Sequence, residues 1–138
     1  MTNSGEHSDV SPPSRVLRCE GFRWAGVLSV SYKDEGESWR AVTRHPLVGV
    51  PEGTPFHVRY FEVGPGGYTT HERHEHQHVV IALRGEGEVR LGGEWLPLRF
   101  GDVVFVASND PHQFRALGDE PFGFLCIVDA ERDRPVPL

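Results

Sequence analysis

The chain has 138 residues and a formal net charge of −6 at pH 7, with Lys and Arg mixed among Asp and Glu throughout. This length suits one domain, and the absence of a basic stripe argues against a nucleic-acid partner. No apolar run approaches the roughly 20 residues needed to cross a bilayer, and the first residues lack the pattern of a signal peptide. With only two cysteines and no C-x-x-C spacing, we expect a cytoplasmic protein with reduced thiols and no membrane partner.

The N-terminal residues 1–14 are rich in Ser, Pro, Asn, Asp and Glu and contain almost no apolar side chains. They cannot bury enough surface to offset the entropy of ordering. We therefore predict a disordered tail over 1–14, followed by a single domain over 15–138 whose core motifs lie at 58–128.

Between this tail and the middle of the chain, the apolar pattern is broken. Phe22, Trp24 and residues 27–30 indicate short strands. Residues 33–38 resemble a charged turn, and residues 39–50 favour no particular element. We expect this region to pack one or two short edge strands on the main body.

From Phe56 onward, short β-rich runs alternate with glycine and proline, which is typical of an all-β sandwich or barrel. A strand over 57–63 is expected to end at the glycine-rich residues 64–67, which do not sustain a ladder. Further strands are predicted at 79–83, 86–91, 95–100 and 103–106, near Phe114 and at 122–128. Gly92-Gly93 is predicted to form a hairpin turn. Because no window has a sustained helical period, the predicted fold is an antiparallel β-barrel or jelly roll.

Histidine is concentrated in one short segment, since four of the eight histidines lie within residues 71–78. Residues two apart in an extended chain share a face, and here that face would carry Glu72, His74, His76 and His78. Imidazoles crowded together repel when protonated and are poorly solvated when buried, whereas a divalent cation gives their lone pairs a partner. The alternative is an exposed His/Glu loop that binds no ligand.

The glycine spacing around this segment resembles the cupin superfamily, whose first motif is G-(x)5-H-x-H-(x)3,4-E-(x)6-G. From Gly66 to Gly85 the register matches without a gap, although Glu and His have exchanged places within it. The second motif, G-(x)5-P-x-G-(x)2-H-(x)3-N, matches at Gly101 and His112. Its proline, second glycine and asparagine are replaced here by Ala107, Asn109 and Ala116.

The resemblance implies that three histidines and one glutamate hold one divalent transition metal, and carrying the positions across gives Glu72, His74, His78 and His112. A bulge in the chain would instead let His76 or His71 replace Glu72. Imidazole and carboxylate ligands suit Fe, Mn, Ni, Co, Cu or Zn, and the sequence does not choose among them.

Inward-facing side chains of the predicted barrel would line a mainly apolar cavity suited to a small organic substrate. Tyr60 and Phe114 are the candidates for substrate binding. An anionic substrate could be anchored by a guanidinium group, for which the candidates are Arg59, Arg73, Arg84 and Arg90.

Three classes of function remain, and the predicted site favours the first. The first class is a metal-dependent enzyme acting on a small molecule, either by dioxygenation or by redox-neutral isomerisation or lyase chemistry. The second is a non-catalytic cupin that binds or senses a small ligand, and the third is a metal-free structural barrel. The resemblance also implies a homodimer, for which the N-terminal strands offer an intersubunit sheet.

Overall fold

The computed structural model describes residues 12–33 and 38–138. Most of the predicted tail and most of the predicted charged turn lie outside the described residues. The described residues form β1 (Cys19–Glu20), β2 (Arg23–Trp24), β3 (Val30–Ser31), β4 (Arg40–Val48), the 3-10 helix η1 (Val50–Glu52), β5 (Phe56–Tyr68), β6 (Glu72–Arg73), β7 (His78–Arg84), β8 (Glu86–Leu91), β9 (Glu94–Leu98), β10 (Val103–Val106), β11 (His112–Leu117), β12 (Phe122–Asp129) and β13 (Val136–Pro137).

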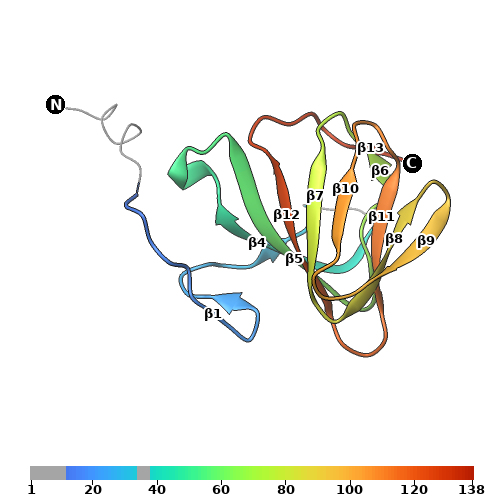
Figure 1. Ribbon diagram of the computed structural model, residues 1–138, viewed down its shortest axis with the longest axis horizontal. Coiled ribbons are helices and arrows are strands. Elements are labelled where there is room, and N and C mark those ends of the chain that lie inside the picture. Colours follow the sequence, from blue (N-terminus) through green and yellow to red (C-terminus); the bar gives the residue numbers. More distant parts are fainter. Residues whose placement is uncertain (1–11, 34–37) are drawn as a thin grey trace.

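One large antiparallel sheet curls into the body of the molecule (Figure 1). Its strands follow the order β10-β7-β12-β5-β11-β6-β13, while β4 and β3 extend from β5, and β8 and β9 extend from β11. All of the pairings are antiparallel. The predicted all-β fold, an antiparallel barrel of the jelly-roll type, is therefore confirmed.

The glycine-rich residues 64–67 do not end their strand, so that prediction was wrong. β5 continues to Tyr68 and changes partner along its length, pairing with β12 up to Val63 and with β11 at Tyr68. Gly66 has φ +76, and a Cβ on Gly67 would lie 2.6 Å from the Arg40 carbonyl oxygen of β4. The glycines therefore let the strand bend and approach its neighbour closely, which any larger residue would prevent.

Residues 39–50, which favoured no element, contain β4, and this strand pairs along most of β5. Its buried residues Val42 and His45 are three apart because they lie on opposite faces of the strand, Val42 in the hydrophobic core and His45 against Tyr60. Burial on both faces hides the two-residue period on which a strand prediction depends. By contrast, the predicted Gly92-Gly93 hairpin is confirmed, since Leu91 pairs with Glu94 and both glycines have positive φ.

The interior of the barrel contains a layer of aromatic rings. Phe124 stacks on Phe61 and Phe114, with ring centroids 5.5 and 4.8 Å apart, and Phe122 lies 5.4 Å from Phe124. All four side chains are buried. Such packing is worth more than the buried area alone, because the rings adopt favourable offset geometries. This layer, which we call the aromatic floor, lies beneath the open end of the barrel and consists of the rings of Phe61, Phe114, Phe122 and Phe124.

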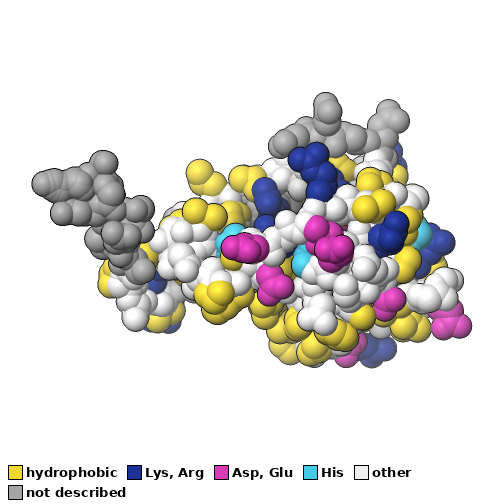
Figure 2. Space-filling view, turned by 90° about the horizontal axis from the view of Figure 1, so that it is seen from above, with side chains coloured by type: hydrophobic (Ala, Val, Ile, Leu, Met, Phe, Trp, Pro, Cys, Tyr) yellow, Lys and Arg dark blue, Asp and Glu magenta, His cyan; other side chains and the backbone are white. Residues whose placement is uncertain are grey.

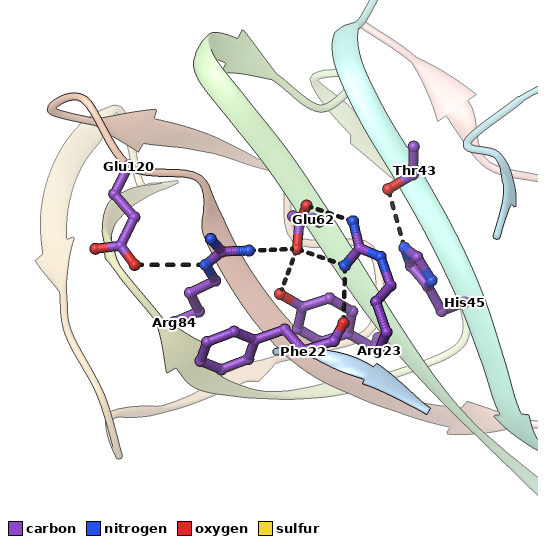
Figure 3. A network of polar contacts seen from close by, with 8 residues as sticks. Phe22, Arg23, Thr43, His45, Glu62, Arg84 and Glu120 are labelled. Carbon is purple, nitrogen blue, oxygen red and sulfur yellow. Dashed lines mark hydrogen bonds and ion pairs between the residues drawn. The ribbon is translucent and has the colours of Figure 1, made fainter. Parts of the chain in front are cut away.

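A second, polar cluster fixes the N-terminal hairpin to the outer face of β5 (Figure 3). Glu62 accepts hydrogen bonds from both Nη atoms of Arg23 at 3.0 and 3.1 Å, from Arg84 at 3.0 Å and from the Tyr60 hydroxyl at 2.9 Å. The Arg84 guanidinium also lies 4.8 Å from the centroid of the Phe22 ring. The predicted packing of short N-terminal strands on the barrel is thus confirmed, and Arg23 and Phe22 provide its contacts.

The surface has mixed character. Acidic and basic side chains are interspersed over the face shown in Figure 2. No helix within residues 12–33 and 38–138 is long and apolar enough to span a membrane. Cys19 is exposed, Cys126 is buried, and both are free thiols.

Candidate metal centre

Side chains from three separate segments converge at one end of the barrel. Glu72 lies on β6 and His74 follows that strand, while His78 and His112 are the first residues of β7 and β11. Because β6 pairs with β11, Glu72 lies directly opposite His112. The four predicted ligands are therefore brought together by the sheet topology.

The expected sharing of one face by alternate residues is found between residues 71 and 78. The even-numbered residues are buried or half-buried, whereas Arg73, Glu75 and Gln77 are exposed. Strand pairing stops after Arg73 and resumes at His78, so the alternation persists through a short unpaired segment. All four even-numbered side chains therefore turn away from bulk solvent.

His74 and His112 face each other through their Nε2 atoms, which are 3.1 Å apart. The His74 Nδ1 atom lies 2.6 Å from the His76 carbonyl oxygen, and the His112 Nδ1 atom lies 2.9 Å from the Asp110 carbonyl oxygen. Since a carbonyl oxygen only accepts hydrogen bonds, each Nδ1 atom must donate a proton. In neutral rings, two Nε2 lone pairs then point at one another, and a cation between them would turn this repulsion into attraction.

The spacing of these two nitrogens fits a shared ion. Nitrogen ligands about 2.1 Å from one metal lie about 3.0 Å apart at a right angle and about 3.4 Å apart at the tetrahedral angle. The 3.1 Å between the Nε2 atoms of His74 and His112 lies between these two values. The two nitrogens are therefore spaced so that one ion could bind both.

The donor atoms form two overlapping groups, within each of which all atoms lie within 4.8 Å of one another. One group is Glu72, His74 and His112, and the other is His74, His76 and His78. The structure thus places the alternative ligand His76 beside the four predicted ones, while neither group includes His71.

His76 is held by a partner that the sequence motifs do not contain. Its ring stacks on His74 with centroids 3.8 Å apart, and its Nδ1 atom lies 2.7 Å from Asp133 Oδ1. Asp133 also accepts hydrogen bonds from the backbone N–H groups of Glu75 and His76, which hold the pKa of the Asp133 carboxyl well below its usual range. This carboxylate fixes the segment that carries His74.

Glu72 and His78 each contact one further side chain. The Lys33 Nζ atom lies 2.8 Å from Glu72 Oε1, and the Cys126 sulfur lies 3.7 Å from His78 Nδ1. Sequence reasoning missed both Lys33 and Asp133 as neighbours of the site. No motif spacing marks them, because their positions depend on how distant parts of the chain fold back onto the barrel.

Burial controls the protonation of the histidines. It lowers the pKa of His74, His78 and His112, and repulsion between the neighbouring imidazoles lowers the pKa of His74 and His78 further. The rings are therefore neutral near pH 7, which is the form that binds a metal ion.

Two cavities adjoin the donor cluster. The inner one, of about 30 Å³, is lined by aromatic side chains that include Phe61, Phe114 and Phe124. The outer one, of about 250 Å³, lies against Glu72 and His78 and is lined by several cationic side chains. The centre is therefore flanked by an apolar space on one side and a charged space on the other.

The two predicted substrate-binding residues lie in different places. Phe114 lines the inner cavity, but Tyr60 lies on the opposite face of β5, where it packs 5.0 Å from Trp24 and donates to Glu62. The structure does not bring Tyr60 to the histidines, because the N-terminal hairpin buries it on the outside of the barrel. Phe61, its neighbour in sequence, faces the cavity instead.

The four candidate arginines also separate. Arg59 lines the outer cavity. Arg84 belongs to the outer-face cluster with Glu62, and neither of the two cavities beside the donor cluster is lined by Arg73 or Arg90. Arg59 is thus the only one of the four that lies beside the donor cluster.

These features define a small jelly-roll barrel with a metal-capable cluster of histidine and glutamate at its open end. The cupin domain family matches residues 59–128, and the chain belongs to the cupin family. It is 46% identical over 115 residues to 1-methylthio-D-xylulose 5-phosphate methylsulfurylase from Rhodospirillum rubrum, covering 83% of this chain and 73% of that protein.

Solved structures agree with this membership. A cupin-2 domain protein from Rhodospirillum rubrum has a TM-score of 0.79 and 42% identity, covering 92% of this chain and 84% of that one. A cupin 2 conserved barrel domain protein from Rhodopseudomonas palustris also has a TM-score of 0.79, with 40% identity and coverage of 91% and 86%. The barrel is therefore shared over nearly the whole length of the chain.

Proposed function

We propose that this cupin is a metal-dependent enzyme acting on a small organic molecule that carries an anionic group. The proposed ligands of one divalent transition metal are Glu72, His74, His78 and His112. The observation that carries the proposal is the pair of Nε2 atoms of His74 and His112, 3.1 Å apart with both Nδ1 atoms committed to backbone carbonyls. This arrangement is unfavourable in neutral rings without a cation and favourable with one.

Each part of the site has a role in this proposal. When bound, the ion would polarise a substrate carbonyl or activate water or dioxygen. The Asp110 and His76 carbonyls fix the ring orientations of His112 and His74, and Lys33 orients the Glu72 carboxylate. The aromatic floor excludes water below the reacting group, which strengthens electrostatic interactions in the site.

The substrate class follows from similarity and chemistry together. The relative from Rhodospirillum rubrum is named for 1-methylthio-D-xylulose 5-phosphate, a phosphorylated ketose. A ketose offers adjacent carbonyl and hydroxyl oxygens, which could both bind an ion held by these protein ligands. We therefore favour chemistry beside a sugar carbonyl over dioxygenation.

Elemental analysis of the purified protein tests the metal assignment. Wild type should hold about one transition-metal ion per chain, whereas His74→Ala and His112→Ala should each weaken metal binding at least about tenfold, the loss that even an outer partner of a ligand can cause. His71→Ala is the matched control, because this histidine lies in the same segment outside both donor groups. Equal metal content in wild type and in both ligand variants would refute the proposal.

A second pair of variants tests the fourth ligand. Glu72→Gln should lower the metal content more than His76→Gln, because Glu72 lies in one donor group with both His74 and His112, whereas the group that contains His76 does not include His112. Loss of metal confined to His76→Gln would replace Glu72 by His76 in the ligand set.

A further inference from the structure

The outer cavity is cationic and opens directly beside the proposed metal ligands. Its lining includes Lys33, Arg44, Arg59 and Arg132, and it shares Glu72 and His78 with the donor cluster. Cationic side chains outnumber the carboxylates that line it, although the whole chain carries a net charge of −6. A local surplus of positive charge in an acidic protein points to an anionic ligand.

Arg59 is the most informative residue of this cavity, because its charge is buried without an anion. The residue is 9% exposed, its guanidinium lies 5.0 Å from the centroid of the Phe61 ring, and its Nη2 atom lies 3.5 Å from the Cys126 sulfur. Its Nε atom is buried and has no hydrogen-bond partner. Within residues 12–33 and 38–138, no carboxylate forms an ion pair with Arg59, so its desolvation is not compensated by the protein itself.

Arg132 adds a second cation to the lining of this cavity. Its Nη1 atom lies 3.0 Å from His57 Nδ1 and 2.8 Å from the Asp129 carbonyl oxygen, which are both neutral groups. Burial, and then repulsion from Arg59, lower the pKa of Arg132. Because Arg59 and Arg132 line the same cavity, an anion bound there would relieve the repulsion between their charges.

We propose that the outer cavity binds the phosphate group of the substrate, with Arg59 and Arg132 as its principal contacts and Lys33 at the edge nearest the metal ligands. This inference rests on the proposed function, because it assumes that another part of the same substrate reaches the metal ion. Two guanidinium groups can each form paired hydrogen bonds with a tetrahedral oxyanion, and their combined charge suits a phosphate dianion better than a single carboxylate. The arrangement would anchor one end of a substrate while its oxygens reach the ion.

Binding of inorganic phosphate to the full-length, metal-loaded protein tests this subsite. Isothermal titration calorimetry at fixed ionic strength should show that phosphate binds wild type more tightly than acetate does. Arg59→Met, which removes the guanidinium but leaves an unbranched apolar side chain beside Phe61, should weaken phosphate binding at least about tenfold, as expected when a charged hydrogen-bond partner is lost. Arg132→Gln, at an exposed position, should weaken it several-fold.

Arg134→Gln is the matched control, because this exposed arginine lies two residues from Arg132 but does not line the cavity. It should leave phosphate affinity unchanged. Equal affinity of wild type, Arg59→Met and Arg132→Gln, or equal binding of acetate and phosphate by wild type, would overturn the subsite. Equal phosphate affinities are expected if Arg59 has only a structural role, in which its guanidinium packs on Phe61.

The metal-deficient variant His112→Ala separates this inference from the proposed function. Phosphate binding that survives in His112→Ala and is lost in Arg59→Met supports the subsite, because the anion is then held by the arginines. If phosphate binding is lost in His112→Ala and retained in Arg59→Met, the phosphate binds the ion, and the proposed subsite is overturned. Wild type that holds no metal but binds phosphate through Arg59 refutes the proposed function while the subsite stands.

Discussion

The two faces of β5 each bury a charged side chain, but only one face neutralises it. On the outer face, Glu62 receives hydrogen bonds from Arg23, Arg84 and Tyr60. Burial alone would raise the pKa of Glu62, but the hydrogen bonds from Arg23 and Tyr60 outweigh it and lower the pKa. This charge is fully used by the fold, because it ties the N-terminal hairpin to the barrel.

On the inner face, Arg59 contacts an aromatic ring and a sulfur atom instead of an oppositely charged group. Proteins retain such uncompensated buried charges mainly where function needs them, since the fold alone would be more stable without them. The charge of Glu62 therefore stabilises the structure, whereas we infer that the charge of Arg59 serves to bind a ligand. Their neighbouring positions on one strand make the difference directly testable.

The largest difference should appear in the free energy of unfolding. Glu62→Ala should lower it by about 2–3 kcal/mol, because Arg23 and Arg84 lose their shared buried partner. Arg59→Met should change it by less than about 1 kcal/mol, or raise it, because an uncompensated buried charge is replaced by an apolar side chain of similar length. Urea unfolding in phosphate-free buffer measures both effects.

Two controls make this comparison specific. Glu94→Ala, at an exposed position on β9, should change stability by less than about 0.5 kcal/mol. Metal content should be unchanged in Glu62→Ala, because Glu62 faces away from the donor cluster. Similar losses of stability in Glu62→Ala and Arg59→Met would show that the two faces do not differ in the way proposed.

The contrast between the two faces could not be predicted from sequence, although much of the site could. Motif spacing and alternation along 72–78 predicted the donor residues that the fold brings together, because these depend on local spacing and one strand pairing. The sequence placed Tyr60 inside the barrel, but the three consecutive residues 59–61 are all buried. Alternation fails there because the outer face is covered by the β1–β2 hairpin, and the docking of that hairpin depends on tertiary contacts.

The same reason explains the other omissions. Lys33 and Asp133 reach the site from segments distant in sequence from Glu72 and His76, so neither has a detectable spacing relative to them. The strands from β8 to β12 were predicted well, since each is short and bounded by turn residues, whereas the two-residue β13 was not predicted. The path of β5 through 64–67 was missed because glycine marks a strand end and a strand bend equally well.

The donor cluster and the outer face of β5 should also lose stability in different pH ranges. Burial lowers the pKa of His78 in the folded state. Below pH 6.5, the ordinary pKa of histidine, the unfolded chain therefore binds more protons at this residue than the folded protein does. In the presence of a chelator, stability should therefore fall by about 1 kcal/mol between pH 7 and pH 5.5 from this histidine alone. Glu62 has a lowered pKa, so its contribution persists above its ordinary value of 4.5 and is lost as pH falls below it.

Two variants test whether His78 and Glu62 cause the losses of stability in these two pH ranges. In urea titrations across pH, His78→Gln should reduce the loss between pH 7 and pH 5.5 and leave the loss below pH 4.5 intact. Glu62→Gln should do the reverse. If His78→Gln leaves the loss between pH 7 and pH 5.5 unchanged, His78 is not a buried neutral group in the folded protein.

The smallest effect refines the comparison within the outer face itself. Arg84 contacts two carboxylates, Glu62 at 3.0 Å and Glu120 at 3.4 Å, whose side chains are 12% and 60% exposed. Glu120→Gln should cost less than about 0.5 kcal/mol, since water screens an exposed pair and replaces its hydrogen bonds. A double-mutant cycle with Arg84→Met should give a far larger coupling energy for Glu62 than for Glu120. Equal coupling energies would mean that burial does not govern the strength of these pairs, and the burial of the unpaired Arg59 would then no longer point to an anionic ligand.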